Sequence, residues 1–122
     1  MYTIKQVAEK MQISPYTLRY YDNEGLFPLV TRNENKVRLF SEGDLEWVHL
    51  VQCLRDTDMP VSEVKHYVEL FKQGENTLKE RYQIILKQKE KVEEEILEMN
   101  KRLKLLEMKA AHYSKMLQNT AE

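Results

Sequence analysis

The sequence predicts a mainly α-helical chain that starts with a winged helix-turn-helix carrying a small β-hairpin and ends in a long coiled-coil helix. Three observations support this prediction. Two helix-start signals flank a short turn near the beginning, two short strand candidates surround a turn-rich segment, and a heptad pattern runs unbroken through the last third of the chain.

The first helix is predicted over residues 3–11. Thr3 and Gln6 have the spacing of a capping box, in which the hydroxyl accepts from the third free N–H and the glutamine side chain reaches back to the cap. The apolar residues of this segment then fall on one face, and they are Ile4, Val7, Ala8 and Met11. Residues 12–14 follow as a turn.

The second helix is predicted over residues 15–24. Ser14 can accept an N–H that the first turn leaves free, and Pro15 loses no hydrogen bond at the first helical position. Leu18 and Tyr21 are expected to face inward. The side chains expected to face outward are Thr17, Arg19 and Tyr20.

A short hairpin is predicted after these helices. Residues 25–28, Gly-Leu-Phe-Pro, stop the second helix, and strand candidates at 30–32 and 37–39 surround the turn-rich segment 33–35. The basic residues of this hairpin are Arg32, Lys36 and Arg38.

The order of these elements suggests a DNA-binding surface. A cationic, aromatic helix directly after a tight turn suits the major groove, and a basic two-stranded wing suits phosphates. The candidate DNA-binding residues are Pro15, Tyr16, Thr17, Arg19 and Tyr20 on the second helix, Arg32, Lys36 and Arg38 on the wing, and Arg55 further along. The alternatives are a generic helical hairpin with a solvated arginine and a solvated charged wing, which explain the charges but not their order.

Two further helices are predicted over residues 41–56 and from 61 to about 74, and we expect them to complete the core beneath the first pair. Their apolar residues include Leu45, Trp47, Val48, Leu50, Val51 and Leu54, then Val64, Tyr67, Val68 and Phe71. Arg55 lies near the end of the first of these helices, where its charge can equally compensate the helix dipole.

Charge is distributed unevenly along the 122 residues, whose formal net charge is −1. Residues 1–40 hold six Lys+Arg and four Asp+Glu. Residues 41–72 hold three basic and seven acidic residues, and residues 73–122 hold ten basic and nine acidic residues. The excess positive charge therefore lies where the DNA contacts are predicted. This excess is small, so phosphate binding would rely on a few placed contacts and on two copies of the domain.

The last long segment has the clearest periodicity in the chain. Twelve positions recur at alternating steps of four and three residues, and we call them the seam: Leu78, Tyr82, Ile85, Lys89, Val92, Ile96, Met99, Leu103, Leu106, Ala110, Tyr113 and Leu117. This is a coiled-coil pattern, and it predicts homodimerisation because the chain offers no second long helix to cover it. Lys89, its one polar member, is expected to set register or to lie at a frayed end.

The predicted organisation is a DNA-binding domain at residues 1–74, a dimerisation helix at 75–117 and a frayed tail at 118–122. A compact domain of about 70 residues is near the lower limit for a self-sufficient core, which also favours a partner chain. No apolar run approaches the roughly 18 residues of a membrane span and no signal peptide opens the chain. With a single cysteine, these features predict a cytoplasmic protein.

The chain resembles the MerR family of transcription regulators. The motifs that carry the resemblance are Thr3-Ile4-Lys5-Gln6-Val7-Ala8, then Ile13-Ser14-Pro15-Tyr16-Thr17-Leu18-Arg19-Tyr20-Tyr21-Asp22-Asn23-Glu24-Gly25-Leu26, then Arg32-Asn33-Glu34-Asn35-Lys36-Val37-Arg38-Leu39-Phe40. The resemblance covers roughly residues 1 to 72 at the level of motifs. One departure is Lys36-Val37-Arg38, where the family usually has Gly-Tyr-Arg, so one wing contact of the family is in doubt here.

The resemblance implies a set of further properties. Family members pair through antiparallel dimerisation helices, and the position of Arg55 contacts the DNA backbone. The dimer binds a promoter with an over-long spacer and activates it together with RNA polymerase by bending and untwisting the DNA. These properties are expectations for this chain.

The effector is less clear. Metal-sensing relatives carry paired cysteines at the end of the dimerisation helix, where this chain has Ala110-Ala111-His112-Tyr113-Ser114, and a multidrug-binding domain would not fit in the remaining length. The three histidines, His49, His66 and His112, are scattered one per helix. No metal site and no cofactor are predicted, and nothing in the sequence supports enzyme chemistry.

Cys53 allows two interpretations. A lone cysteine on an apolar helix is usually a small buried hydrophobe. However, Gln52-Cys53-Leu54-Arg55 resembles the AdhR/NmlR-like branch of the family, whose single cysteine at this position responds to formaldehyde or other reactive carbonyls. His49 precedes Cys53 by one helical turn and could favour the reactive thiolate.

The predicted function is a homodimeric transcription regulator that binds a pseudo-palindromic promoter, with Cys53 and His49 as the candidate sensor. The alternative is an adaptor, in which the coiled coil binds another protein while the winged domain anchors it to DNA without sensing. A sensor would change its DNA complex or promoter output with a small effector, and an adaptor would not.

Overall fold

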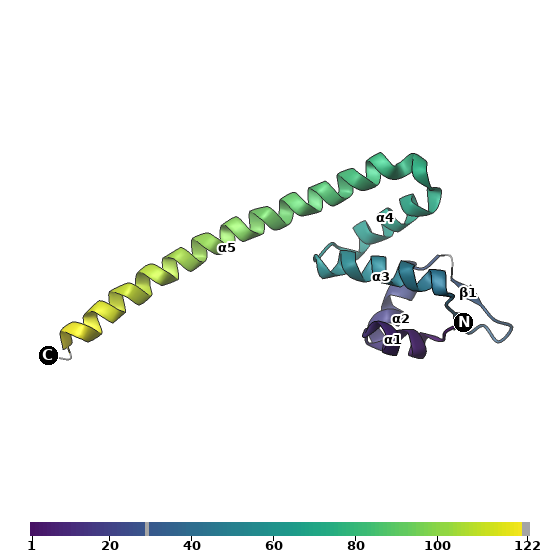
Figure 1. The fold of residues 1–122 in the computed structure, drawn as a ribbon, viewed down its shortest axis with the longest axis horizontal. Helices are drawn as coiled ribbons and strands as arrows, with labels where there is room; N and C mark the ends of the chain where they lie inside the picture. The colour runs from purple at the N-terminus through teal and green to yellow at the C-terminus, as the bar shows by residue number, and fades with distance from the viewer. Residues whose placement is uncertain (29, 121–122) are drawn as a thin grey trace. The chain divides into compact units, whose positions relative to one another are not determined.

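A computed structural model of the chain describes residues 1–28 and 30–120. The elements in chain order are α1 (Ile4–Met11), α2 (Pro15–Asn23), β1 (Thr31–Arg32), β2 (Arg38–Leu39), α3 (Glu42–Asp56), α4 (Val61–Gln73), the 3-10 helix η1 (Glu75–Thr77) and α5 (Leu78–Thr120) (Figure 1). The prediction of a mainly helical chain with one small hairpin and a long C-terminal helix is confirmed.

Two compact units make up the chain, Met1–Ile84 and the residues from Ile85 onward. The predicted boundary after residue 74 coincides with the junction of α4 and η1. The first unit continues past this junction because Ile84, in the second turn of α5, packs against the core of the helices before it.

Local signals start each of the early helices. Thr3 and Gln6 form both hydrogen bonds of a capping box on α1, at 3.3 Å and 2.9 Å. Gln12 then turns the chain in the left-handed region, with φ of 56°. Ser14 caps α2 by accepting from the Thr17 N–H at 3.0 Å, directly before Pro15. The tight turn between α1 and α2 is therefore encoded by residues within it.

The core lies where α1, α2, α3 and α4 meet. Side chains that are fully buried include Val7, Leu18, Leu26, Phe27, Phe40, Val51, Met59, Val64 and Val68. Phe27 and Phe40 pack edge to face with ring centroids 5.8 Å apart. The Trp47 indole N–H donates to the Leu26 carbonyl at 2.8 Å, which ties α3 to the segment after α2.

The wing is a two-stranded antiparallel hairpin in which Thr31 pairs with Leu39 and Arg32 with Arg38. Its turn is organised by Asn33, whose side-chain oxygen accepts from the Asn35 and Val37 N–H groups at 2.9 Å and 3.0 Å. A side-chain acceptor of this kind stabilises a tight turn that a two-residue strand pair could not hold alone.

The junction between α4 and α5 is hydrogen-bonded through one buried hydroxyl. Thr77 is 3% exposed, and its single hydroxyl proton is shared between the Leu70 and Gly74 carbonyl oxygens, both 2.7 Å from Oγ1. Arg81 donates to the Thr77 hydroxyl at 3.0 Å and stacks over Phe71, with 5.0 Å between guanidinium and ring centroid. This cluster orients the start of α5 on the first unit.

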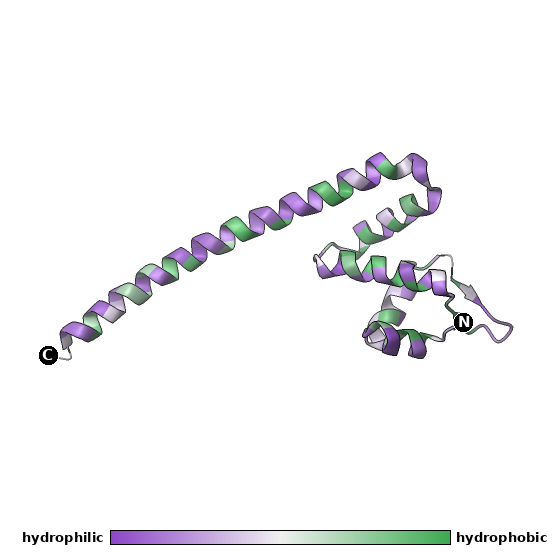
Figure 2. Ribbon diagram, viewed as in Figure 1, coloured by the Kyte–Doolittle hydropathy of each residue, from purple (hydrophilic) through white to green (hydrophobic). Residues whose placement is uncertain are grey.

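The long helix α5 spans 43 residues, about 65 Å at 1.5 Å per residue. It continues through Thr120, so the predicted frayed tail is helical at 118–120, and residues 121–122 lie outside the described part. Lys89 is therefore well inside the helix and not at a frayed end. Apolar residues recur along α5 between polar ones (Figure 2).

Most of the seam is exposed in a single copy. The seam residues among the exposed large apolar side chains are Leu78, Tyr82, Ile85, Ile96, Met99, Leu103, Leu106, Tyr113 and Leu117. No helix in the described residues is both long and apolar enough to cross a bilayer.

Candidate nucleic-acid interface

Helix α2 presents an exposed aromatic and cationic face. Leu18 and Tyr21 are buried at 0% and 6% exposure, as predicted, and they hold the helix on the core. On the opposite side, Tyr16 and Tyr20 are 82% and 43% exposed, and Arg19 is exposed as well. Large aromatic groups facing water on a helix directly after a tight turn are the arrangement expected of a groove-reading element.

Thr17 lies nearer the turn than the other outward residues. Its hydroxyl accepts from the Ser14 hydroxyl at 2.8 Å, and its side chain is half-buried. Pro15 is exposed at the start of the helix. Hydrogen bonds therefore cap the first turn of α2, while the exposed side chains of Tyr16, Arg19 and Tyr20 can contact another molecule.

The tip of the wing carries free positive charge. Arg32 and Lys36 are both exposed, and one terminal nitrogen of Arg32 donates to the Lys36 carbonyl at 2.8 Å. Lys36 itself has φ of 61°. This hydrogen bond holds the Arg32 guanidinium against the backbone of Lys36, and exposed cations at the tip of a hairpin suit contacts with phosphates.

Arg38 has its guanidinium engaged within the fold, and its predicted contact with phosphate stays a prediction. Its nitrogens donate to both carboxylate oxygens of Asp22, and also to the carbonyls of Phe27 and Val30. The two side chains are 15% and 6% exposed. The hydrogen bonds to Asp22 raise the pKa of Arg38 above its ordinary value. Arg38 therefore positions the wing against α2.

Asp22 is a residue that the sequence interpretation did not single out. It lies in the last turn of α2, and its carboxylate receives a forked, two-point contact from Arg38 on β2. Such bidentate pairs fix orientation as well as distance. The available signal was a single acid at the end of a helix followed by a basic hairpin, which by itself does not identify the pair.

Arg55 has a half-buried side chain in the last turn of α3. One terminal nitrogen donates to the Met59 carbonyl at 2.6 Å, across the turn that leads to α4. This contact agrees with the helix-end interpretation of Arg55. Its predicted contact with the DNA backbone stays a prediction.

Cys53 is exposed, so its interpretation as a small buried hydrophobe is wrong for the single chain. Its sulfur lies 3.5 Å from the Nε2 atom of His49, one turn earlier on α3. The helix therefore brings together the two candidate sensor residues at the surface. A separate cavity of about 300 Å³ lies between α3 and α4, lined by Gly43, Glu46, Trp47, Leu50 and Phe71.

The sequence from residue 2 to residue 70 matches the family described as MerR HTH family regulatory protein. An uncharacterised helix-turn-helix transcriptional regulator of Haemophilus influenzae is 43% identical over 114 residues, covering 93% of this chain and 84% of that protein. The transcriptional regulator AdhR of Bacillus subtilis is 30% identical over 89 residues, covering 73% of this chain and 64% of that protein.

Solved structures show the same similarity. HiNmlR, a MerR family regulator lacking the sensor domain and crystallised bound to promoter DNA, is 43% identical with a TM-score of 0.74, over 93% of this chain and 90% of that one. A putative MerR family transcriptional regulator from Listeria monocytogenes is 33% identical with a TM-score of 0.79, over 93% of this chain and 86% of that one.

Proposed function

The chain belongs to the MerR family of helix-turn-helix transcription regulators, and from this premise we propose that it binds a promoter as a homodimer and activates transcription by distorting the DNA. The observation that carries the proposal is the similarity to HiNmlR, which is bound to promoter DNA and matches nearly the whole chain. The exposed faces of α2 and the wing supply the chemistry for the same task.

Base contacts are assigned to α2. Tyr16, Arg19 and Tyr20 are exposed on its outer face, and Thr17 lies beside them. An arginine can bind guanine edges with two hydrogen bonds, and aromatic or threonine side chains can pack on thymine methyl groups. We therefore expect α2 to determine which sequence is bound.

Backbone contacts are assigned to the exposed cations of the wing. Arg32, whose guanidinium donates to the Lys36 carbonyl, and Lys36 itself have no ion-pair partner among the described residues. Arg55, half-buried at the end of α3, is a further candidate. Such contacts fix the position and orientation of the protein on the duplex without reading its sequence.

Homodimerisation is assigned to the seam of α5. Exposed apolar residues along a helix of this length favour association with a second copy. A dimer would place one winged domain on each half of a pseudo-palindromic operator. By family resemblance, the dimer bends and untwists an over-long spacer so that RNA polymerase can use the promoter, and the specificity then includes the energy of deforming the DNA.

Cys53 is proposed as the sensor of a reactive carbonyl compound. Its thiolate sulfur would add to the carbonyl carbon, forming a C–S bond, while the carbonyl oxygen takes up a proton to give a hemithioacetal. The sulfur is exposed, which gives a reactive compound access, and the Nε2 atom of His49 lies 3.5 Å away as a neighbouring polar group.

Base reading is tested by measuring affinity for a matched and a scrambled operator. Tyr20→Ala and Thr17→Ala should lower the preference for the matched operator, with little effect on the scrambled one. Glu69→Ala, a change at an exposed position of α4, is the control and should leave the preference unchanged. Equal loss on both operators would show that α2 does not read the sequence.

Sensing is tested with Cys53→Ser. This variant should bind the promoter normally and fail to respond to formaldehyde, and mass spectrometry of the native chain should find the adduct on Cys53. His49→Leu should lower the rate of modification more mildly. An unmodified Cys53, or a serine variant that still responds, would remove Cys53 from the proposal and leave the regulator without an identified effector site.

A further inference from the structure

The cavity between α3 and α4 has aromatic walls. Its volume of about 300 Å³ falls at the small end of the range of about 300–1,000 Å³ that ligand sites occupy. Trp47 of α3 and Phe71 of α4 meet edge to face in its lining, with ring centroids 5.1 Å apart and 87° between the rings. The two rings therefore form a corner, in which a ligand can contact more than one aromatic surface.

Both aromatic walls are held by contacts outside the cavity. The Trp47 indole N–H donates to the Leu26 carbonyl at 2.8 Å. Phe71 has the Arg81 guanidinium over its ring at 5.0 Å, and Arg81 also donates to the Thr77 hydroxyl at 3.0 Å. A ligand would meet walls that are already in place, so binding it costs little ordering of side chains.

The polar group that the lining offers to a ligand is the carboxylate of Glu46. Glu46 is exposed and has no ion-pair partner among the described residues. The Trp47 indole N–H is already committed to a carbonyl, and the Leu50 side chain is apolar. A ligand that fits this lining therefore has apolar groups, one positive charge and little need for hydrogen-bond acceptors.

An alkylated ammonium ion has these properties. A primary ammonium carries several N–H groups that each need an acceptor, whereas a quaternary ammonium carries none. Its methyl groups can pack on aromatic faces while the ring quadrupole attracts the charge, and tryptophan attracts a cation more strongly than the other aromatic residues do. Phe71 already has a cation over its ring, and Trp47 has none within the described part of the chain.

The charge of the surrounding segment favours a cation as well. Residues 41–72, which include α3 and α4, hold seven acidic and three basic residues. This excess of negative charge has no use in binding phosphates, which it repels. A field of one sign around a cleft raises the local concentration of ligands of the opposite sign.

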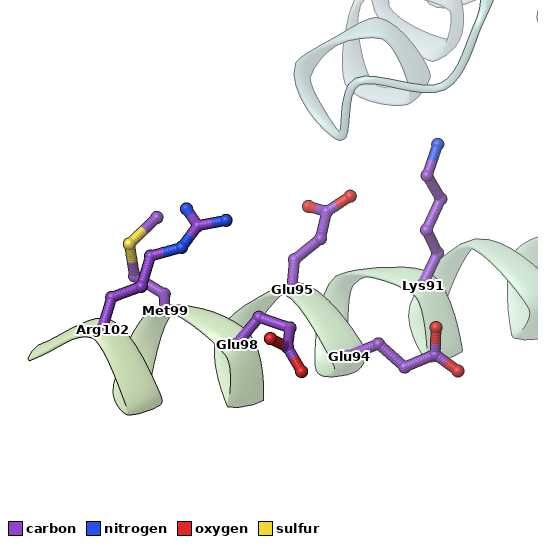
Figure 3. A pocket seen from close by; sticks show the side chains of 6 residues that line it. All are labelled: Lys91, Glu94, Glu95, Glu98, Met99 and Arg102. Carbon is purple, nitrogen blue, oxygen red and sulfur yellow. The ribbon is translucent and has the colours of Figure 1, made fainter. Parts of the chain in front are cut away.

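A larger hollow beside α5 differs in kind. It measures about 530 Å³ and is lined by six residues of one helix, Lys91, Glu94, Glu95, Glu98, Met99 and Arg102. Figure 3 shows Glu95, Met99 and Arg102 projecting to one side of the helix, while Glu94 and Glu98 project to another. All six side chains are exposed and their charges are of both signs, so they neither enclose a ligand nor select its charge.

We propose that the cavity between α3 and α4 binds a small alkylated ammonium ion. The apolar groups of the ligand lie against Trp47, Phe71 and Leu50, and its positive charge lies beside the Glu46 carboxylate. The site uses none of the residues assigned to DNA contacts or to carbonyl sensing, so the inference goes beyond the proposed function and does not rest on it.

Choline and its neutral analogue test the proposal on the full chain. In 3,3-dimethyl-1-butanol, a carbon atom replaces the choline nitrogen, so the two probes have the same shape and differ in charge. Trp47 is the one tryptophan of the chain, and its fluorescence therefore reports on this cavity. Choline should change the fluorescence with a Kd about 5-fold or more below that of the alcohol. Equal affinities, or no saturable response to choline, would overturn the proposal.

Glu46→Gln separates the carboxylate from the aromatic walls. It should raise the Kd for choline about 3-fold and leave the Kd for the alcohol unchanged, because it removes the charge and keeps the shape. Glu63→Gln is the matched control, an exposed acid in the first turn of α4 that does not line the cavity, and it should change neither Kd. Equal effects of the two variants would show that the charge of Glu46 is not specific to the site.

Gly43→Leu tests the place of binding by filling the cavity that Gly43 lines. A Cβ atom at this position would meet only the Ser41 Oγ at 3.8 Å, so the chain should fold as before, which circular dichroism checks. The Kd for choline should rise about 10-fold or more. A folded Gly43→Leu chain that binds choline normally would place the ligand elsewhere and overturn the proposal.

Cys53→Ser separates this site from the proposed carbonyl sensor. The serine variant should bind choline with the native Kd, because Cys53 does not line the cavity. A serine variant that no longer binds choline would overturn the separate site. Failure of the native chain to respond to formaldehyde or to bind an operator would count against the proposed function alone.

Discussion

At the scale of single residues, the pair of Asp22 and Arg38 shows how a charge in a basic hairpin can be structural. Both side chains are largely buried, and the Arg38 guanidinium also binds two backbone carbonyls. Arg32, its cross-strand neighbour, is exposed and keeps its charge for another molecule. Like charges directly opposite each other destabilise a hairpin, and Asp22 removes that repulsion.

Removing Asp22 should therefore destabilise the fold. Asp22→Ala leaves the Arg38 guanidinium unpaired in a mostly buried position, and we expect the free energy of unfolding to fall by about 2–3 kcal/mol. Chemical denaturation followed by circular dichroism measures the change. Arg32→Ala is the matched control and should stay within about 0.5 kcal/mol of the native chain. Equal effects of the two variants would show that the buried pair does not hold the wing.

The wing cation should instead control the response of binding to salt. If Arg32 neutralises one phosphate per protomer, Arg32→Ala should weaken binding to every sequence and reduce the slope of log affinity against log salt by about one unit per protomer. Titrations on matched and scrambled operators give the slope. Lys72→Ala, on α4, is the control, and an undiminished slope for Arg32→Ala would exclude a phosphate contact there.

At the scale of elements, the connection from α4 to α5 depends on a polar residue inside the fold. The Thr77 hydroxyl shares its proton between two carbonyls near the end of α4 and accepts from Arg81 in the first turn of α5. A helix end that is buried without such partners leaves several backbone groups unpaired. This hydroxyl therefore holds the first turn of α5 against the end of α4, within the first unit.

Thr77→Val tests that role because it keeps the shape and removes the hydroxyl. We expect the free energy of unfolding to fall by about 1–3 kcal/mol, since buried groups lose their partner. Thr77→Ser retains the hydrogen bonds and should recover most of this loss. Thermal or chemical denaturation of the two variants measures this free energy. Equal stability of Thr77→Val and the native chain would show that the junction does not need the hydroxyl.

At the scale of the whole molecule, the proposed binding of DNA by a homodimer can be tested at the seam. Ile96→Lys places a charge at the centre of the seam, where burying it without a partner is costly. The dimer should dissociate in sedimentation experiments and operator affinity should fall with it. Leu97→Lys is the matched control, because Leu97 is equally exposed in the single chain and lies off the seam. An unchanged dimer for Ile96→Lys would mean that another surface joins the copies.

The sequence by itself determined the helices, the turn, the wing, the seam and the family, because these depend on residues a few positions apart. Thr3 with Gln6, Ser14 with Pro15 and the heptad period all act within one or two helical turns, and the structure has the expected caps and helices in those places.

Tertiary structure alone decided which side chains remain free for function. Arg32 and Arg38 are both arginines of the same hairpin, so the sequence does not distinguish their roles. Packing brings the Asp22 carboxylate, 16 positions away in the chain, to Arg38. Likewise, Cys53 lies on an apolar helix, and only the arrangement of α3 on the core leaves its sulfur exposed beside His49. The period of apolar residues predicts which side chains share one face of a helix. The partner of a charged or reactive side chain depends instead on segments that are distant along the chain.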